Sequence, residues 1–174
     1  MITAPAELST SAREILDTAR GILEEEGRDA LTMRAIGLRM GIRAPSLYKH
    51  FPDKRAIEVS LIAVGFVELA DVIDSATSGR RPLAALGRAY RRFALDHPHL
   101  YRLMTTQPLP RDDLPPGLED RAAAPLLSIA GSLPRARAIW GFAHGLVMLE
   151  LNGRFPAGAD IDAAWREGIR AFSQ

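Results

Sequence analysis

Apolar residues recur along most of this chain at spacings of three and four positions, the period of an α-helix with one buried face. A first helix is predicted to begin at Ser9–Ser11, with a capping box between Ser11 and Glu14, and to end at Gly27. Its buried stripe is expected to consist of Ile15, Ala19, Ile22 and Leu23.

Residues 32–54 predict two short helices joined by a tight turn. Thr32 is a good N-cap for the first, and Gly41 fits the turn because glycine adopts positive φ without steric cost. Pro45 suits the first turn of the second helix, where a missing N–H costs nothing. Ile42 is expected to be a buried plug at the turn. The core of this small unit is expected to contain Ile15, Leu23, Leu31, Ile36, Leu47 and Phe51.

A long apolar helix is expected from Lys54 to about Ala76. Further helices are predicted at 83–96, 100–105, 118–133, 135–155 and 160–172, with a loop at 107–117 and a kink or restart at Pro125. No alternation of period two, the mark of a strand, is found in the sequence. The expected fold is therefore all-α with about nine helices. Residues 1–53 would form a three-helix helix-turn-helix domain, and residues 54–174 a second helical domain.

Positive charge is concentrated between residues 32 and 55. This stretch holds six cations and one acid, a local net charge of +5 on a chain whose total is +1. A concentrated positive surface on a nearly neutral protein is what phosphate binding needs. Other charged groups, Glu24–Glu26 and the cations Arg88, Arg91 and Arg92, are expected only as solvated helix surface.

Two short helices joined by a glycine turn, the second short and basic, form the helix-turn-helix arrangement. At these residues the sequence resembles the TetR family of transcriptional regulators. The resemblance covers roughly residues 12–61 and implies a sequence-specific, DNA-binding regulator. The matching positions are Leu31, Thr32, Arg34, Ile36, Gly41, Ile42, Ser46, Leu47, Tyr48, His50, Phe51 and Lys54.

Base reading is expected at the second helix of this motif. Arginine or lysine can reach guanine O6 and N7, and small apolar groups suit a thymine methyl. Whether Arg43 or Lys49 reads guanine, or contacts only phosphate, stays open. The candidates for base reading are Arg43, Ala44, Pro45, Ser46 and Lys49. Thr32 is expected both to cap its helix and to contact phosphate. The family resemblance implies contacts to the DNA backbone from Arg34, Tyr48, His50 and Lys54.

The C-terminal part also carries a resemblance. Residues Trp140-Gly-Phe-Ala-His-Gly145, with His97-Pro98 and Leu100-Tyr101, resemble a TetR-family C-terminal domain named after its Trp-His-Gly residues. This implies a ligand-binding and dimerisation domain. The candidates for its pocket, each with core packing as the alternative, are Tyr90, Phe93, Tyr101, Met104, Trp140 and His144. A symmetric interface of the last two helices would bury Leu146, Leu149, Trp165 and Phe172, unless these only fill the protomer core.

Other chemistry finds little support in the sequence. There is no cysteine, which excludes disulfides and thiolate metal sites and suits a cytoplasmic protein. His97 and His99 lack the neighbours that a metal site needs, and no cofactor is expected. No signal peptide, membrane span, phosphate-cradling loop or catalytic motif is recognisable, so no enzyme is predicted.

The sequence thus predicts a cytoplasmic, homodimeric regulator, more specifically a repressor of a near-palindromic operator. A small, largely apolar effector bound between the helices of residues 83–155 would release it from the DNA. One alternative is a regulator that needs no effector, or an activator. An alternative of another class is a helical scaffold or enzyme whose basic stretch docks on an acidic protein.

Overall fold

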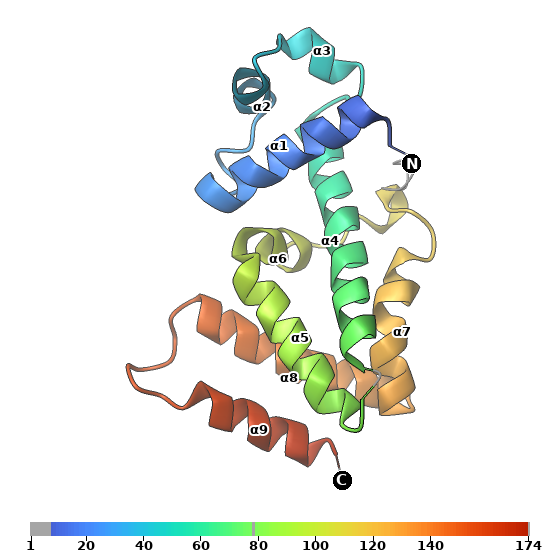
Figure 1. Cartoon of the computed structure of the whole chain (residues 1–174), viewed down its shortest axis with the longest axis vertical. Helices are drawn as coiled ribbons and strands as arrows, with labels where there is room; N and C mark the ends of the chain where they lie inside the picture. Colours follow the sequence, from blue (N-terminus) through green and yellow to red (C-terminus); the bar gives the residue numbers. More distant parts are fainter. Residues whose placement is uncertain (1–7, 78, 174) are drawn as a thin grey trace. The chain divides into compact units, whose positions relative to one another are not determined.

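The computed structural model describes residues 8–77 and 79–173, and these residues are helical, without a strand (Figure 1). Nine α-helices lie among them, which confirms the predicted all-α class. They are α1 (Thr10–Glu26), α2 (Met33–Met40), α3 (Ala44–Tyr48), α4 (Lys54–Thr77), α5 (Pro82–Asp96), α6 (Pro98–Thr105), α7 (Leu118–Ala130), α8 (Leu133–Leu151) and α9 (Ile161–Ala171), with a single 3₁₀ turn, η2 (Arg111–Asp113). None of these helices is long and apolar enough to cross a membrane.

The described residues form two compact units. The first unit comprises 8–67 and 97–118, and the second comprises 68–96 and 119–173. Helix α4 contributes residues to both. The sequence predicts a boundary after residue 53 between a DNA-binding and a ligand-binding domain. The two compact units do not test that functional boundary, which stays a prediction.

The first unit is built on α1. Ser9 is its N-cap, and the Ser9 hydroxyl accepts the N–H of Ala12 at 3.2 Å. The capping box predicted from Ser11 is wrong, because the helix begins at Thr10 and Ser11 already lies inside it. Helix α1 packs on both α2 and α6. The predicted core is confirmed, since all of its members are buried: Ile15, Leu23, Leu31, Ile36, Leu47 and Phe51.

Glu24, expected to be solvated, instead holds the start of α6, so that expectation is wrong. Its carboxylate oxygens accept the backbone N–H groups of His99 and Leu100, both at 3.1 Å. These N–H groups lie in the first turn of α6, where they have no partner within the helix, and the helix dipole favours a negative charge there. Glu24 thereby links the end of α1 to the beginning of α6.

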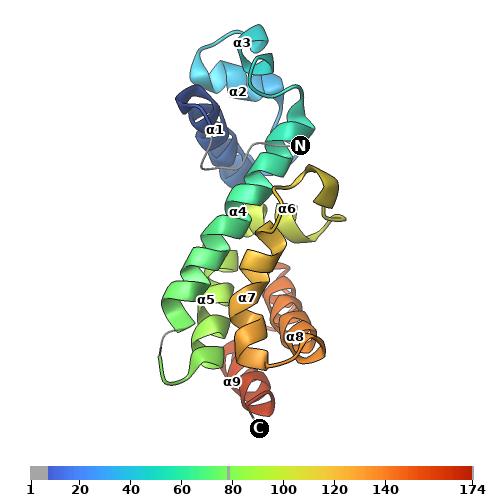
Figure 2. The same cartoon turned by 90° about the vertical axis from the view of Figure 1, so that its right-hand side faces the viewer.

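In the second unit, α5 packs against both α8 and α9 (Figure 2). One cluster of buried residues joins α5, α7 and α8, with side chains of α9 packed on it: Leu83, Ala130, Ala136 and Ile139, covered by Leu126, Ile129, Ile169 and Phe172. Phe142 of α8 places its ring 5.7 Å from Trp165 and 5.8 Å from Phe172. Aromatic packing therefore holds α9 on α8.

The prediction that Arg91 faces water is wrong. Its Nε and Nη2 donate to the two carboxylate oxygens of Glu150 on α8, at 2.8 and 2.7 Å, and its Nη1 donates to Asp162 on α9. Arg88 and Arg92 are exposed, as expected. Helical period alone could not distinguish Arg91, because its partners lie 59 and 71 residues further along the chain.

Several boundaries and burial predictions also change. Helix α7 continues through Pro125 as one element, and α8 ends at Leu151, earlier than the predicted Phe155. The loop 107–117 contains η2 and the buried Leu114. Val72 is exposed although it lies in the long helix that the sequence predicts to be apolar.

Candidate nucleic-acid interface

The turn between α2 and α3 has the geometry that the sequence predicts. The Thr32 hydroxyl accepts the backbone N–H three residues on, at 3.0 Å, so it caps α2. Gly41 adopts the left-handed conformation with φ of 67°. Its N–H donates to Leu38 O at 3.2 Å, and the N–H of Ile42 donates to Gly37 O at 2.9 Å, the pair of bonds that defines a Schellman ending. The helix-turn-helix is confirmed.

Helix α3 is held from one side only. Arg43 occupies its N-cap position, and Pro45 lies in its first turn. Leu47 and Phe51 are buried in the core of the first unit, which leaves the opposite side of α3 open. The predicted contact residues in and beside α3 are exposed: Arg43, Pro45, Ser46, Tyr48, Lys49 and His50. The side chain of Ala44 lies outside what the structure describes.

Ile42 is not the buried plug that the sequence predicts, because 37% of this residue is exposed. A helix of five residues following a tight turn is too short to cover it. Ile42 therefore lies as an apolar residue beside the start of α3. Thr32 and Arg34, at the start of α2, are also exposed.

Ion pairs divide the six cations of this stretch into two groups. Arg39 binds Glu25 and Glu26 of α1 at 2.9 and 2.7 Å, and Arg55 binds Asp113 at 2.8 Å. Arg34, Arg43 and Lys49 form no ion pair with any residue that the structure describes. These three cations carry the open positive charge of α2 and α3.

Lys54 belongs to the paired group. Its Nζ donates to the backbone carbonyl of Arg28 at 2.9 Å and lies 3.6 Å from a carboxylate oxygen of Glu58. The guanidinium of Arg28 donates to both oxygens of Glu58, each at 2.9 Å. Lys54 therefore connects the loop between α1 and α2 to the first turn of α4.

Glu58 is the buried member of this network, with only 8% of the residue exposed. Burial alone would raise the pKa of Glu58, but the hydrogen bonds from Arg28 and the positive charges of Arg28 and Lys54 lower it below its usual value. The sequence reasoning missed both Arg28 and Glu58. The i, i+4 spacing of Lys54 and Glu58 was a detectable signal, whereas nothing local pointed to Arg28.

The six residues predicted for a ligand pocket fall in both units. Tyr101 and Met104 are buried in the first unit, and Tyr90 and Phe93 are buried on α5 of the second. Trp140, of which 51% is exposed, donates from Nε1 to the Tyr90 hydroxyl at 3.2 Å. Its ring lies 6.1 Å from that of His144, and partial burial lowers the pKa of His144. Within the second unit, the structure brings Tyr90, Trp140 and His144 together.

The four residues predicted at a dimer interface have different surroundings. Trp165 is buried and Phe172 packs on the apolar cluster of the second unit, so both have partners within the protomer. Leu146 is half-buried and Leu149 is exposed on α8. Leu133 and Trp140 are also exposed on this helix. No group of three or more His, Asp or Glu side chains among the described residues is placed to hold a metal ion.

Two family models match this chain. Residues 15–59 match the model for bacterial regulatory proteins of the tetR family, and residues 83–172 match the tetracyclin repressor-like C-terminal domain. Together they span the helix-turn-helix and most of the second unit. The likeness of residues 140–145 to the Trp-His-Gly type of C-terminal domain stays a prediction.

Individual relatives agree with these matches. The HTH-type transcriptional regulator Rv0681 of Mycobacterium tuberculosis is 30% identical over 168 residues, covering 87% of this chain and 74% of that protein. A solved structure of a protein of unknown function from Rhodococcus sp. RHA1 is 25% identical, with a TM-score of 0.74 over 97% of this chain and 95% of that one. A TetR variant from Acinetobacter baumannii AYE, solved in complex with minocycline, shares the fold at 22% identity and a TM-score of 0.64, over 95% of this chain and 94% of that one.

Proposed function

The chain belongs to the TetR family of DNA-binding transcriptional regulators, and from this premise we propose that it is a homodimeric repressor released from its operator by a small molecule. Membership in this family assigns it to regulators rather than to enzymes or scaffolds. We place it in the cytoplasm, because the family model that it matches describes bacterial regulatory proteins and bacterial DNA lies there.

The observation that carries the DNA-binding proposal is the open side of α3. The helix is anchored through Leu47 and Phe51, so its other face is free to enter a major groove. Arg43 and Lys49, at the two ends of α3, are exposed and form no ion pair with described residues. Both cations are therefore available to contact a base or a phosphate. Thr32 and Arg34 at the start of α2 are exposed, as are Tyr48 and His50, and we expect these four residues to contact the flanking phosphates.

Dimerisation supplies the second recognition helix. A two-fold dimer places two α3 helices in successive major grooves, about 34–36 Å or a multiple of that distance apart, and so reads a near-palindrome. Helix α8 has exposed apolar side chains that are available for the interface, Leu133 and Trp140 on one face and Leu149 on another. We propose that α8 and α9 of two protomers form a four-helix interface.

Release follows from the course of α4. This helix starts at Lys54, directly after the helix-turn-helix, and continues to Thr77 in the second unit. A small, largely apolar effector bound among the helices of residues 83–155 shifts α4 and moves the two α3 helices off the operator spacing. To do so, the effector must bind the released conformation more tightly than the DNA-bound one. The minocycline complex of the related TetR variant supports a ligand site in such a fold.

The switch is tested by titrating a preformed protein–operator complex with compounds from a small-molecule library and following DNA binding by fluorescence anisotropy. A repressor of this kind loses affinity for the operator with at least one compound, and that compound binds the free protein saturably. If every compound that binds the protein leaves operator affinity unchanged, release by an effector is rejected for that set of compounds. The alternative of a regulator that needs no effector then replaces the proposal.

A further inference from the structure

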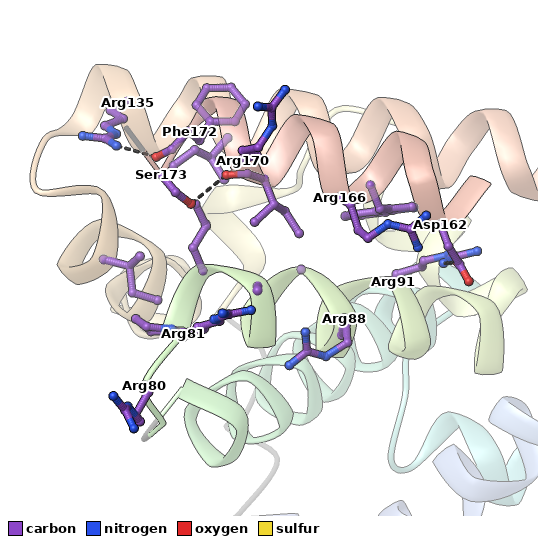
Figure 3. A pocket seen from close by; sticks show the side chains of 18 residues that line it. Arg80, Arg81, Arg88, Arg91, Arg135, Asp162, Arg166, Arg170, Phe172 and Ser173 are labelled. Atoms are coloured by element: carbon purple, nitrogen blue, oxygen red, sulfur yellow. Dashed lines mark hydrogen bonds and ion pairs between the residues drawn. The ribbon is translucent and has the colours of Figure 1, made fainter. Parts of the chain in front are cut away.

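The second unit contains a cleft between α5 and α9, to which α7 and α8 also contribute (Figure 3). Its cavity volume is about 980 Å³. Small-molecule sites in proteins typically measure about 300–1,000 Å³. Its apolar lining includes Leu83, Ile139, Trp165 and Ile169. The cleft is therefore large enough for a small molecule and has a surface that favours an apolar body.

Arginine dominates the charged part of this lining. Seven arginines line the cleft, against one carboxylate, that of Asp162. Figure 3 shows that they come from both sides, with Arg81 and Arg88 on the α5 side and Arg166 on the α9 side. Four of the seven are held by carboxylates or, in one case, by the backbone carbonyl of Phe172: Arg91, Arg135, Arg166 and Arg170.

The remaining arginines, Arg80, Arg81 and Arg88, are exposed and form no ion pair with described residues. The four carboxylates that pair with cleft arginines offset four of the seven positive charges, which leaves a local excess of +3. The whole chain carries only +1. The cleft therefore keeps unused positive charge beside an apolar surface, which favours a ligand with one anionic end.

Trp165 adds an independent observation. Only 5% of this residue is exposed, and its Nε1 is the one buried side-chain polar atom among the described residues that has no hydrogen-bond partner. Leaving a buried N–H donor unpaired is unfavourable, and such a group calls for an acceptor that the folded chain does not supply. Because Trp165 lines the cleft, a ligand oxygen there is a natural acceptor.

We propose that this cleft binds an acidic amphiphile, a carboxylate joined to an apolar body. The planar guanidinium groups of Arg81 and Arg88 pair with the carboxylate, and the apolar body covers Leu83 and Ile169. The proposal narrows the chemical class of the effector and moves its site, because the cleft includes α9 and lies only partly within residues 83–155. It rests on the proposed function only for its consequence on DNA binding. Ligand binding itself is measured without DNA.

The probe is decanoate, compared with decyltrimethylammonium, which has the opposite charge and an alkyl chain one carbon longer, and with acetate, which has the carboxylate but no long chain. The protein carries Trp140→Phe, which leaves Trp165 as its only tryptophan and therefore as a fluorescent reporter in the cleft. Isothermal titration calorimetry on the unmodified chain supplies the second readout. Decanoate is expected to bind one site per chain at least about tenfold more tightly than either comparison probe.

The matched variants are Arg81→Gln combined with Arg88→Gln, and the control Arg92→Gln, an exposed arginine of α5 outside the cleft. The double variant is expected to weaken decanoate binding about tenfold or more, while the control stays within about twofold of the parent. Because all three side chains are exposed, none of these changes removes core packing.

Several outcomes would overturn the proposal. Absence of decanoate binding, equal binding of decyltrimethylammonium, or equal losses in the double variant and the control each reject an anion site in this cleft. If the double variant instead changes the oligomeric state, the cleft is an interface between copies of the chain. If decanoate binds as predicted but leaves a protein–operator complex intact, the site stands and its role as an effector site is rejected.

Discussion

At the scale of single residues, the difference between paired and unpaired cations defines the proposed DNA contacts. Six cations lie between residues 32 and 55, but three of them, Arg39, Lys54 and Arg55, interact with acidic side chains of the first unit. The sequence could locate the charge, because the lysines and arginines are visible in it. It could not separate the two groups, because the pairing partners lie on other helices.

Lys49→Ala should therefore weaken DNA binding more than Arg39→Ala, the matched control whose charge is already offset by Glu25 and Glu26. If Lys49 contacts phosphate, affinity falls for all DNA and the slope of log K against log salt concentration falls by about 1. If it reads a base, the loss is about 1–3 kcal/mol and confined to one base pair. Fluorescence anisotropy over a salt series separates these cases. Equal behaviour of the two variants would contradict the placement of α3 in the groove.

Glu58→Gln should lower the free energy of unfolding by about 1–3 kcal/mol at pH 7, because the charge-assisted bonds from Arg28 are weakened. The pKa of Glu58 is lower in the folded chain than in the unfolded one. Its contribution to stability is therefore complete above the unfolded value of about 4.3 and is lost as the pH falls through the lower folded value. Urea denaturation at pH 7 and between pH 5 and 3 measures this. A difference from the parent that stays constant down to pH 3 would refute the assignment.

At the scale of helices, the elements could be predicted and most of their ends lie within two residues of the predicted ones, whereas α7 and α8 end three and four residues earlier than predicted. Capping residues such as Thr32 and Asp160 act on N–H groups three positions away, so the sequence shows both partners. Pro125 lies within α7 without ending it, and the N-terminus of α6 is held by Glu24, which is 75 residues distant from His99. Such long-range contacts leave no trace in local periodicity.

Glu24→Ala should destabilise the first unit by about 1 kcal/mol, the typical cost of losing a helix cap. The matched control is Glu25→Ala on the same turn of α1, which removes only an exposed ion pair with Arg39 and should cost at most about 0.5–1 kcal/mol. Hydrogen exchange of the His99 and Leu100 amides supplies a local readout, and these amides should exchange faster only in Glu24→Ala. Unchanged exchange in that variant would show that the carboxylate does not hold α6.

At the scale of the molecule, the proposed dimer gives Gly141 a role. A Cβ added there would meet nothing within 4 Å in the protomer, so a larger side chain is tolerated by the fold. In a close contact between the α8 helices of two protomers, a larger side chain at this position would clash with the partner. Gly141→Arg is therefore expected to yield a folded monomer with greatly reduced operator affinity, whereas Ser128→Arg, an exposed position on α7, stays dimeric. Sedimentation velocity measures both. A dimeric Gly141→Arg protein would place the interface elsewhere.

The helix-turn-helix could be predicted in detail because its signals are local: a cap, a glycine turn, a proline, and the buried Leu47 of α3 with Phe51 just after the helix. The second unit resisted prediction because its features arise between helices. The half-buried pairing of Arg91 with Glu150 joins α5 to α8, and the arginine-lined cleft collects side chains from four helices and a loop. No single stretch of sequence contains either pattern.

The most direct test of the central proposal, a dimeric regulator that reads a specific operator, is selection of binding sites from random DNA with the purified full chain, followed by footprinting. The expected result is one enriched near-palindrome with two symmetric protected half-sites, whose centres lie about 34–36 Å or a multiple of that distance apart. Binding without enrichment of any sequence, or enrichment of a single half-site protected by one protomer, would contradict it.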